Sequence, residues 1–173
     1  MKKFLTDDEY YSDWEYVTNS QLGYLKKGRE YYEMMKLGGK IDSPALRFGN
    51  LLHTLVLEPK TYQDKFVVFN PEDRPEPAKS MASKLNKAWK ETVENREGIV
   101  INLEQYNRAL AMRDKLLRHK EITDILDNST KEVANSWVDF NTMINCKGKA
   151  DIVVNGGDML VDLKTTSKPI TEF

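Results

Sequence analysis

Residues 149–164 read KADIVVNGGDMLVDLK, and this stretch decides the predicted fold. The letters NGGD separate two runs rich in β-branched and aliphatic residues, which is a strong signal for a tight β-hairpin. With Gly156 and Gly157 at the turn, Ile152 faces Val161, and one face of the hairpin is wholly apolar. The stretch therefore predicts two antiparallel strands with one face turned to a core.

The other face of this hairpin is charged, because Asp151 faces Asp162 and Lys149 faces Lys164. Directly opposed residues lie about 4.5–5.5 Å apart at Cβ, and two carboxylates that close repel unless a cation lies between them. Mg²⁺ or Mn²⁺, which prefer oxygen ligands, would fill this position. The alternative is a solvated surface pair. Lys164 favours the metal, because a lysine beside a metal pair is costly unless it holds an anion or a nucleophilic water.

A second hairpin adds a candidate carboxylate. If Asn141 and Thr142 form a two-residue turn, Glu132 faces Asp151 from the neighbouring strand. This turn is not of the Asn-Gly type, and a slip of one residue would move the Glu132 side chain to the opposite face. Glu132 is therefore either a further acidic ligand or a residue of the other face.

The coarse pattern along the chain is helices first and strands last. We expect residues 1–17 to be irregular, 18–126 to be mainly helical, and 131–164 to form a three-stranded antiparallel meander. The fold class predicted is α/β, with a small, mainly antiparallel sheet flanked by helices, in one domain over residues 1–173. Within the helical part, we expect a helix over 18–37 broken at Gly28, helices over 44–57, 78–97 and 103–126 (one or two), and a short strand over 65–69.

Composition excludes several classes of protein. The 173 residues are 40% hydrophobic, enough for a real core. The net charge of −1 gives no global basic signature, which counts against a protein that coats DNA but does not exclude a nuclease, because local lysines and bound cations can contact phosphates. The single Cys146 rules out an internal disulfide and fits a reducing cytoplasm. No apolar run approaches the roughly 20 residues that span a bilayer.

Four segments together resemble a known family of nucleases. Asp151 followed by Asp162-Leu163-Lys164 looks like the PD-(D/E)xK signature, and residues 146–151 with 161–166 resemble more narrowly the RecE-type (exonuclease VIII) phage and prophage branch, related to RecB nuclease domains. Residues 48–59 resemble the histidine motif of that branch, and residues 19–26 resemble the opening of its N-terminal helix. The resemblance runs from about Ser20 to the C-terminus.

This resemblance implies a restriction-endonuclease-like core and a metal-dependent deoxyribonuclease. The implied activity is 5′-to-3′ exonuclease action on double-stranded DNA for recombination, with Mg²⁺ or Mn²⁺ as cofactor. A single-strand annealing protein and further copies of the chain are the implied partners. The implied location is the cytoplasm of a bacterium or of a phage-infected host, with no membrane association.

The resemblance also implies roles for individual residues. Asp151, Asp162 and the Leu163 carbonyl would hold the metal, and Lys164 would orient the attacking water. His53 lies in an apolar helical run, where a core histidine is the usual interpretation, but the resemblance implies a metal ligand. The family is similar in having an acidic residue at the strand of Glu132.

Four further residues are candidates for DNA binding. Thr165 and Thr166 are either phosphate hydrogen-bond donors or ordinary loop residues. Lys147 and Lys149 are either contacts to the DNA backbone or part of a solvated strand edge.

The chain also departs from this family. Lys149-Ala150 stands where Arg-Pro is usual, and related nucleases continue with a Q-x-x-x-Y helix and further strands, whereas this sequence stops at Phe173. We therefore expect a C-terminally truncated member with an open sheet edge that invites pairing with another copy. The alternative function is a catalytically impaired remnant that binds DNA or a protein.

Overall fold

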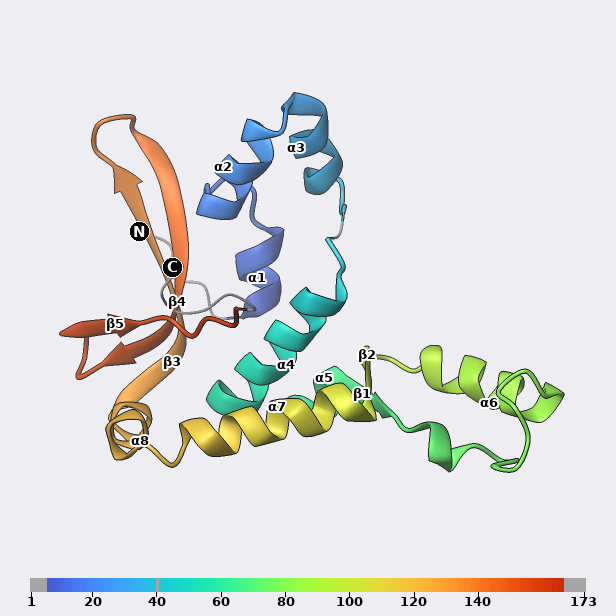
Figure 1. The fold of residues 1–173 in the computed structure, drawn as a ribbon. Helices are drawn as coiled ribbons and strands as arrows, with labels where there is room; N and C mark the ends of the chain where they lie inside the picture. The colour runs from blue at the N-terminus through green and yellow to red at the C-terminus, as the bar shows by residue number, and fades with distance from the viewer. Residues whose placement is uncertain (1–5, 40, 167–173) are drawn as a thin grey trace. The chain divides into compact units, whose positions relative to one another are not determined.

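The computed structural model describes residues 6–39 and 41–166 and shows a mixed α/β protein (Figure 1). The chain divides into two compact units: unit 1 comprises Met1–Ile41 and Leu126–Asp162, and unit 2 comprises Asp42–Ile125 and Leu163–Phe173. The predicted fold class, a small and mainly antiparallel sheet with helices, is confirmed. That residues 1–173 form one domain stays a prediction. No helix in the described part of the chain is long and apolar enough to cross a membrane.

Unit 2 is built around an apolar core. Its elements are α4 (Pro44–Leu57), α5 (Tyr62–Lys65), β1 (Phe66–Phe69), the 3₁₀ turn η1 (Pro71–Asp73), α6 (Lys84–Glu94), β2 (Ile99–Asn102), α7 (Leu103–Leu116) and most of α8 (Lys120–Asp127). α4 and α7 pack against each other (Figure 1). The buried cluster consists of Leu51, Leu55, Phe66, Ile101 and Ala109.

The helix α4 has the boundaries that the sequence predicts. The Ser43 hydroxyl accepts a hydrogen bond from the Leu46 amide, and Pro44 occupies the first turn, where its missing N–H costs nothing. The predicted helix over 103–126 is present as α7 and α8. The strand β1 matches the short strand expected over 65–69.

Two features of unit 2 differ from the prediction. The strand β2 pairs in parallel with β1 and was not expected, because four residues are too few to show a period. The helix expected over 78–97 begins only at Lys84. Its preceding residues fold around the fully buried Asn86, whose side-chain amide donates to the carbonyls of Glu76 and Ser80.

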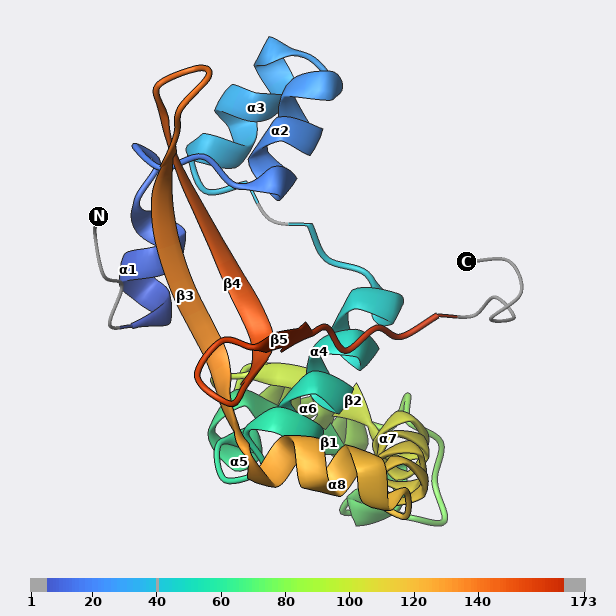
Figure 2. The same ribbon diagram turned by 90° about the vertical axis from the view of Figure 1, so that its left-hand side faces the viewer.

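Unit 1 is a long β-ribbon with short helices. Its elements are α1 (Asp7–Ser12), α2 (Asn19–Lys26), α3 (Arg29–Lys36), β3 (Ser129–Asp139), β4 (Ile144–Val154) and β5 (Met159–Val161). The three strands are antiparallel in the order β3-β4-β5, and Figure 2 shows β3 and β4 as a long ribbon with α1 beside it. Gly28, with a φ of 119°, separates α2 from α3 as predicted.

Both predicted strand registers are confirmed. Ile152 pairs with Val161, and on the other side it pairs with Lys131. The loops are longer than expected: each spans four residues, 140–143 and 155–158, between the flanking strands. The register survives because each loop is centred where the turn was expected.

The prediction that residues 1–17 are irregular is wrong for Asp7–Ser12, which form a helix, whereas residues 13–16 belong to no helix or strand. Thr6 and Glu9 form a capping box, in which each side chain accepts a hydrogen bond from the backbone N–H of the other residue, and α1 follows. A capping box satisfies two of the amide groups that a helix start leaves unpaired. Residues 1–5 lie outside the described residues.

Candidate metal and nucleic-acid site

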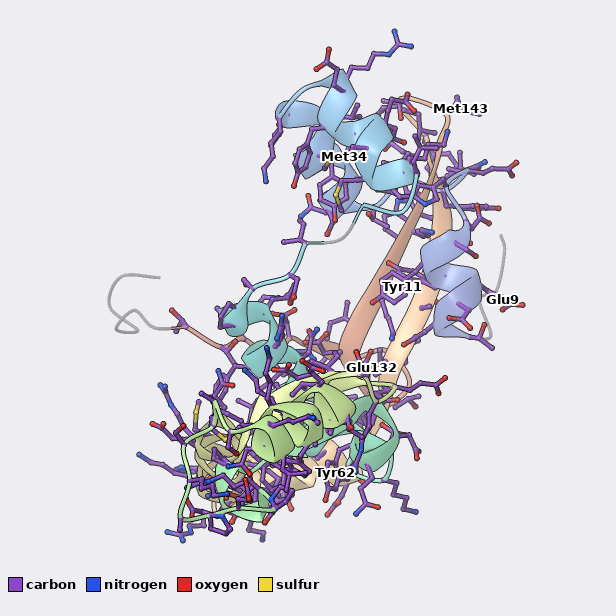
Figure 3. All side chains as sticks on the ribbon, turned by 90° about the vertical axis from the view of Figure 1, so that its right-hand side faces the viewer. Glu9, Tyr11, Met34, Tyr62, Glu132 and Met143 are labelled. Atoms are coloured by element: carbon purple, nitrogen blue, oxygen red, sulfur yellow. The ribbon has the colours of Figure 1, made fainter. Side chains whose placement is uncertain are left out.

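The central strands of unit 1 bring two acidic side chains together. A carboxylate oxygen of Glu132 and one of Asp151 lie within 4.8 Å of each other. On either side of Glu132 the ladder is regular, with Lys131 paired to Ile152 and Val133 to Ala150. Glu132 itself has a φ of 55°, a left-handed conformation that costs a residue with a Cβ about 1–3 kcal/mol. The register therefore places Glu132 across from Asp151, at a locally strained point of β3. Glu132 is labelled in Figure 3.

Lys149 balances the negative charge at this point. Its ammonium forms ion pairs with Glu132 Oε2 at 2.6 Å and with Asp7 Oδ1 of α1 at 2.7 Å, and its side chain is only 13% exposed. Burial by itself would lower the pKa of Lys149. The hydrogen bonds and charges of Asp7 and Glu132 outweigh burial, so that its pKa lies above the usual range. The ring of Tyr11, labelled in Figure 3, lies 6.0 Å from the same ammonium.

Lys147, two residues earlier on the same face, is 3% exposed. Its ammonium donates to the backbone carbonyls of Tyr10 and Asp13 and lies 4.8 Å from the Tyr10 ring centroid. Lys147 thus anchors α1 to β4 instead of lying on a solvated strand edge. A contact from Lys147 to DNA would require the ammonium to leave these carbonyls, and that role stays a prediction.

Asp162 lies just beyond the hairpin ladder. β5 ends at Val161, so the Asp151–Asp162 pair falls one step outside the last residue pair of β4 and β5. Among the described residues, Glu132, Asp151 and Asp162 do not all lie within 4.8 Å of one another. Asp151 and Asp162 do line one pocket of unit 1, which has a volume of about 460 Å³.

Unit 2 supplies a second group of candidate ligands. His53 Nε2 lies 2.6 Å from the Leu163 carbonyl oxygen. A carbonyl can only accept, so in this contact Nε2 carries the proton. Leu163 precedes Lys164 in the chain, and the side chain of Lys164 is exposed. The helix α4 therefore holds the main chain directly before the candidate catalytic lysine.

One turn before His53, Gly49 of α4 lies close to Thr165 and adds a second contact between α4 and the segment after β5. A Cβ added at Gly49 would lie 3.2 Å from Thr165 Oγ1, which is tighter than ordinary van der Waals contact. Gly49 and His53 are four residues apart and thus share one face of the helix. This face of α4 contacts Leu163 and Thr165, two residues that are separated by Lys164 in the segment after β5.

The donor atoms within each unit fit a hard divalent ion. Unit 1 offers the carboxylates of Glu132, Asp151 and Asp162, and unit 2 offers an imidazole and a backbone carbonyl. Carboxylate and carbonyl oxygens are the usual ligands of Mg²⁺ and Mn²⁺, and imidazole is a sound ligand for Mn²⁺. Sequence reasoning did not identify the Asp7–Lys149–Glu132 bridge, because Asp7 is 142 positions away from Lys149 and no local pattern connects them.

The chain matches the family described as PDDEXK-like domain of unknown function (DUF3799) over residues 19–172, and it belongs to that family. The match includes all of the described strands in both units and begins after α1. None of the curated proteins matches the chain. Membership in a PDDEXK-like family supports a nuclease-type function with DNA as substrate, and such nucleases typically use divalent metal ions.

Proposed function

We propose that this protein is a metal-dependent deoxyribonuclease that hydrolyses phosphodiester bonds. The observation that carries the proposal is the pair Glu132 and Asp151, whose carboxylate oxygens lie within 4.8 Å on the central strands of a PDDEXK-like domain. Two carboxylates so close favour a bound cation. The neighbouring Lys149 offsets part of this charge through its ion pair with Glu132.

We further propose that Asp151, Asp162 and the Leu163 carbonyl bind Mg²⁺ or Mn²⁺, with His53 and Glu132 completing its ligands. Two ligands at right angles on an ion with bonds of 2.0–2.1 Å are about 3 Å apart. The 2.6 Å between His53 Nε2 and the Leu163 oxygen is close to that spacing. His53 would need to move its proton to Nδ1 before Nε2 could bind the ion, because only an unprotonated nitrogen binds a metal.

The bound ion would polarise the phosphate and lower the pKa of a coordinated water. The role that we assign to Lys164 is to orient the attacking water and to offset the negative charge of the transition state. Its exposed side chain next to Leu163 supports access to substrate. Thr165 and Thr166 would donate hydrogen bonds to the DNA backbone, and Lys149 would act there only after giving up one of its ion pairs.

The finer assignment rests on the resemblance to RecE-type enzymes. On that basis we propose 5′-to-3′ degradation of linear double-stranded DNA in recombination, with a single-strand annealing protein as partner and further copies of the chain as neighbours. By the same resemblance we expect the protein to act in the cytoplasm of a bacterium or of a phage-infected host. The competing function, a module that binds DNA or protein without cleavage, is an outcome of the experiment below.

The test compares cleavage of linear and circular duplex DNA with Mg²⁺ or Mn²⁺. We expect degradation of the linear form alone, and loss of cleavage in Asp162→Asn, because a neutral amide weakens metal binding and removes the balancing charge. Asp158→Asn, in the exposed loop of the same hairpin, is the matched control and should cleave normally. Cutting of circular DNA would indicate an endonuclease, and a folded protein that binds metal without cleaving would favour the binding module.

Lys164→Ala separates the role of the lysine from that of the metal ligands. We expect lower turnover with metal binding largely intact, since the lysine acts on the water and the phosphate. Metal binding is read from the rise in melting temperature on titration with Mg²⁺ or Mn²⁺. A Lys164→Ala variant that cleaves as fast as the unmodified protein would contradict this mechanism.

A further inference from the structure

Unit 2 contains a pocket of about 490 Å³ beside the segment that follows Lys164. Its walls come from α4, from α7 and from the chain after β5. The lining residues are Pro44, Ala45, Phe48, Gln105, Arg108, Met112, Thr165 and Thr166. No acidic side chain is among them, in a protein whose net charge is −1.

The polar groups of this pocket are mostly hydrogen-bond donors. Arg108 brings a guanidinium, Gln105 a side-chain amide, and Thr165 and Thr166 bring hydroxyls that donate or accept. Anions with several oxygen atoms suit such a set, and a guanidinium matches a phosphate with two parallel hydrogen bonds.

Arg108, an exposed residue of α7, contacts an aromatic ring of α4. The Arg108 guanidinium lies over the Phe48 ring, 5.3 Å from its centroid. An arginine can contact a ring in this way and still use its N–H groups to bind an anion. The packing of α4 on α7 brings this pair together, because Phe48 lies on α4 and Arg108 on α7.

The opposite wall is fixed by the contacts of α4 with residues 163 and 165. His53 meets the Leu163 carbonyl, and Gly49 approaches Thr165 Oγ1 so closely that an added Cβ would crowd it. Two residues of extended chain span at most about 7 Å. Thr166 therefore lies within that distance of Lys164 along the main chain, roughly the separation of neighbouring phosphates on one nucleic-acid strand.

We infer that this pocket binds a backbone phosphate of DNA next to the phosphate that is cleaved, with Arg108 as its anchor. The inference rests on the proposed nuclease function and deepens it, because it names a phosphate subsite and a residue outside the metal ligands. Gln105, Thr165 and Thr166 complete the set of donors. Arg108 would hold the DNA strand while the neighbouring phosphate, beside Lys164, is cleaved.

The experiment measures binding of a fluorescently labelled blunt DNA duplex by anisotropy, in EDTA, over a series of salt concentrations. The variants are Arg108→Gln and, as matched control, Arg113→Gln. Arg113 lies on the same helix, carries the same charge and pairs with Asp114 outside the pocket. EDTA makes the readout independent of the metal ligands, and melting temperatures check that both variants fold.

We expect Arg108→Gln to bind DNA about tenfold more weakly, as for the loss of a charge-assisted hydrogen bond. The slope of log affinity against log salt should fall by about 1, because one phosphate contact is lost. Arg113→Gln should bind DNA like the unmodified protein. The affinity of Arg108→Lys should lie between those of the unmodified protein and Arg108→Gln, since lysine keeps the charge but cannot form two parallel hydrogen bonds to a phosphate.

Equal binding by Arg108→Gln and Arg113→Gln overturns the inference and leaves the nuclease proposal standing. Binding that depends on Arg108 in a protein that cleaves nothing with Mg²⁺ or Mn²⁺ supports the subsite and overturns the nuclease proposal. An unmodified protein that does not bind the duplex overturns both.

Discussion

The two units bury different kinds of groups. Unit 2 closes around aliphatic and aromatic side chains, whereas unit 1 buries Lys147 and holds Lys149 by two carboxylates. Unit 1 also leaves more apolar surface exposed. In the described part of the chain its Phe140 reaches 89% exposure, while the most exposed large hydrophobic residue of unit 2 is Leu85 at 56%.

This contrast shows where stability and the candidate chemistry are coupled. In unit 2 the buried cluster is formed by apolar side chains, and Arg108 contacts Phe48 at the margin of that cluster. A change of Arg108 should therefore leave the fold of unit 2 intact. In unit 1 the lysines that fasten α1 to the ribbon lie beside Glu132 and Asp151. Changes to those lysines should therefore alter both folding and the carboxylate pair.

The largest expected effect is in the core of unit 2. Leu51→Ala removes a side chain with no exposed surface and should lower the free energy of unfolding by about 3–5 kcal/mol. Denaturant unfolding measures the loss. Leu46→Ala, at an exposed position of the same helix, is the control and should cost far less. Equal losses at both positions would contradict the assignment of the core of unit 2 to the buried face of α4.

The next effect is expected at the buried lysine of unit 1. Lys147→Met keeps the aliphatic stem but leaves the carbonyls of Tyr10 and Asp13 without their charged donor, at a cost of about 2–3 kcal/mol. Hydrogen exchange should show lost protection in α1 before the rest of unit 1. Lys26→Met, at an exposed position of α2, should change neither quantity. If Lys147→Met leaves the free energy of unfolding unchanged, apolar packing alone holds α1.

A smaller loss, about 1–2 kcal/mol, is expected for Lys149→Met. Asp7→Asn, which removes only one of the two ion pairs of Lys149, should cost less. The pKa of Lys149 is raised in the folded protein, so its contribution is fully present below the unfolded-state lysine pKa of about 10.4 and is lost as the pH rises through the folded value. The free energies of unfolding of the unmodified protein and of Lys149→Met, measured at neutral and at strongly alkaline pH, check this. The difference between the two proteins should shrink only at alkaline pH.

The smallest effect is expected for Gly49→Ala. Alanine favours a helix by about 0.5–1 kcal/mol over glycine, but the new Cβ would crowd Thr165 Oγ1, so the net change should be near zero. In a Thr165→Ala background the crowding atom is absent, and the same substitution should stabilise by the full amount. A double-mutant cycle of unfolding free energies measures the coupling. A coupling free energy of zero would mean that Gly49 and Thr165 are not in close contact.

Several parts of the fold could be predicted from the sequence because their causes are local. Ser43-Pro44 gives the start of α4, Gly28 separates two helices, and the hairpin around Gly156 sets a register that the structure confirms. Period and turn chemistry act within a few residues, so they can be read without the rest of the chain. The same local reasoning places Glu132 across from Asp151, in agreement with the ladder between β3 and β4.

Other features depend on residues far apart in the chain and follow from tertiary packing. The strand β2 exists because β1 offers it a partner, and the role of Lys149 depends on Asp7, at the other end of the chain. The phosphate pocket joins Phe48, Arg108 and Thr165 from three separate segments. Local sequence patterns predicted the types of candidate ligand and the strands that carry them. Packing determined their ion-pair partners, because buried charges are satisfied by whatever the fold brings within reach.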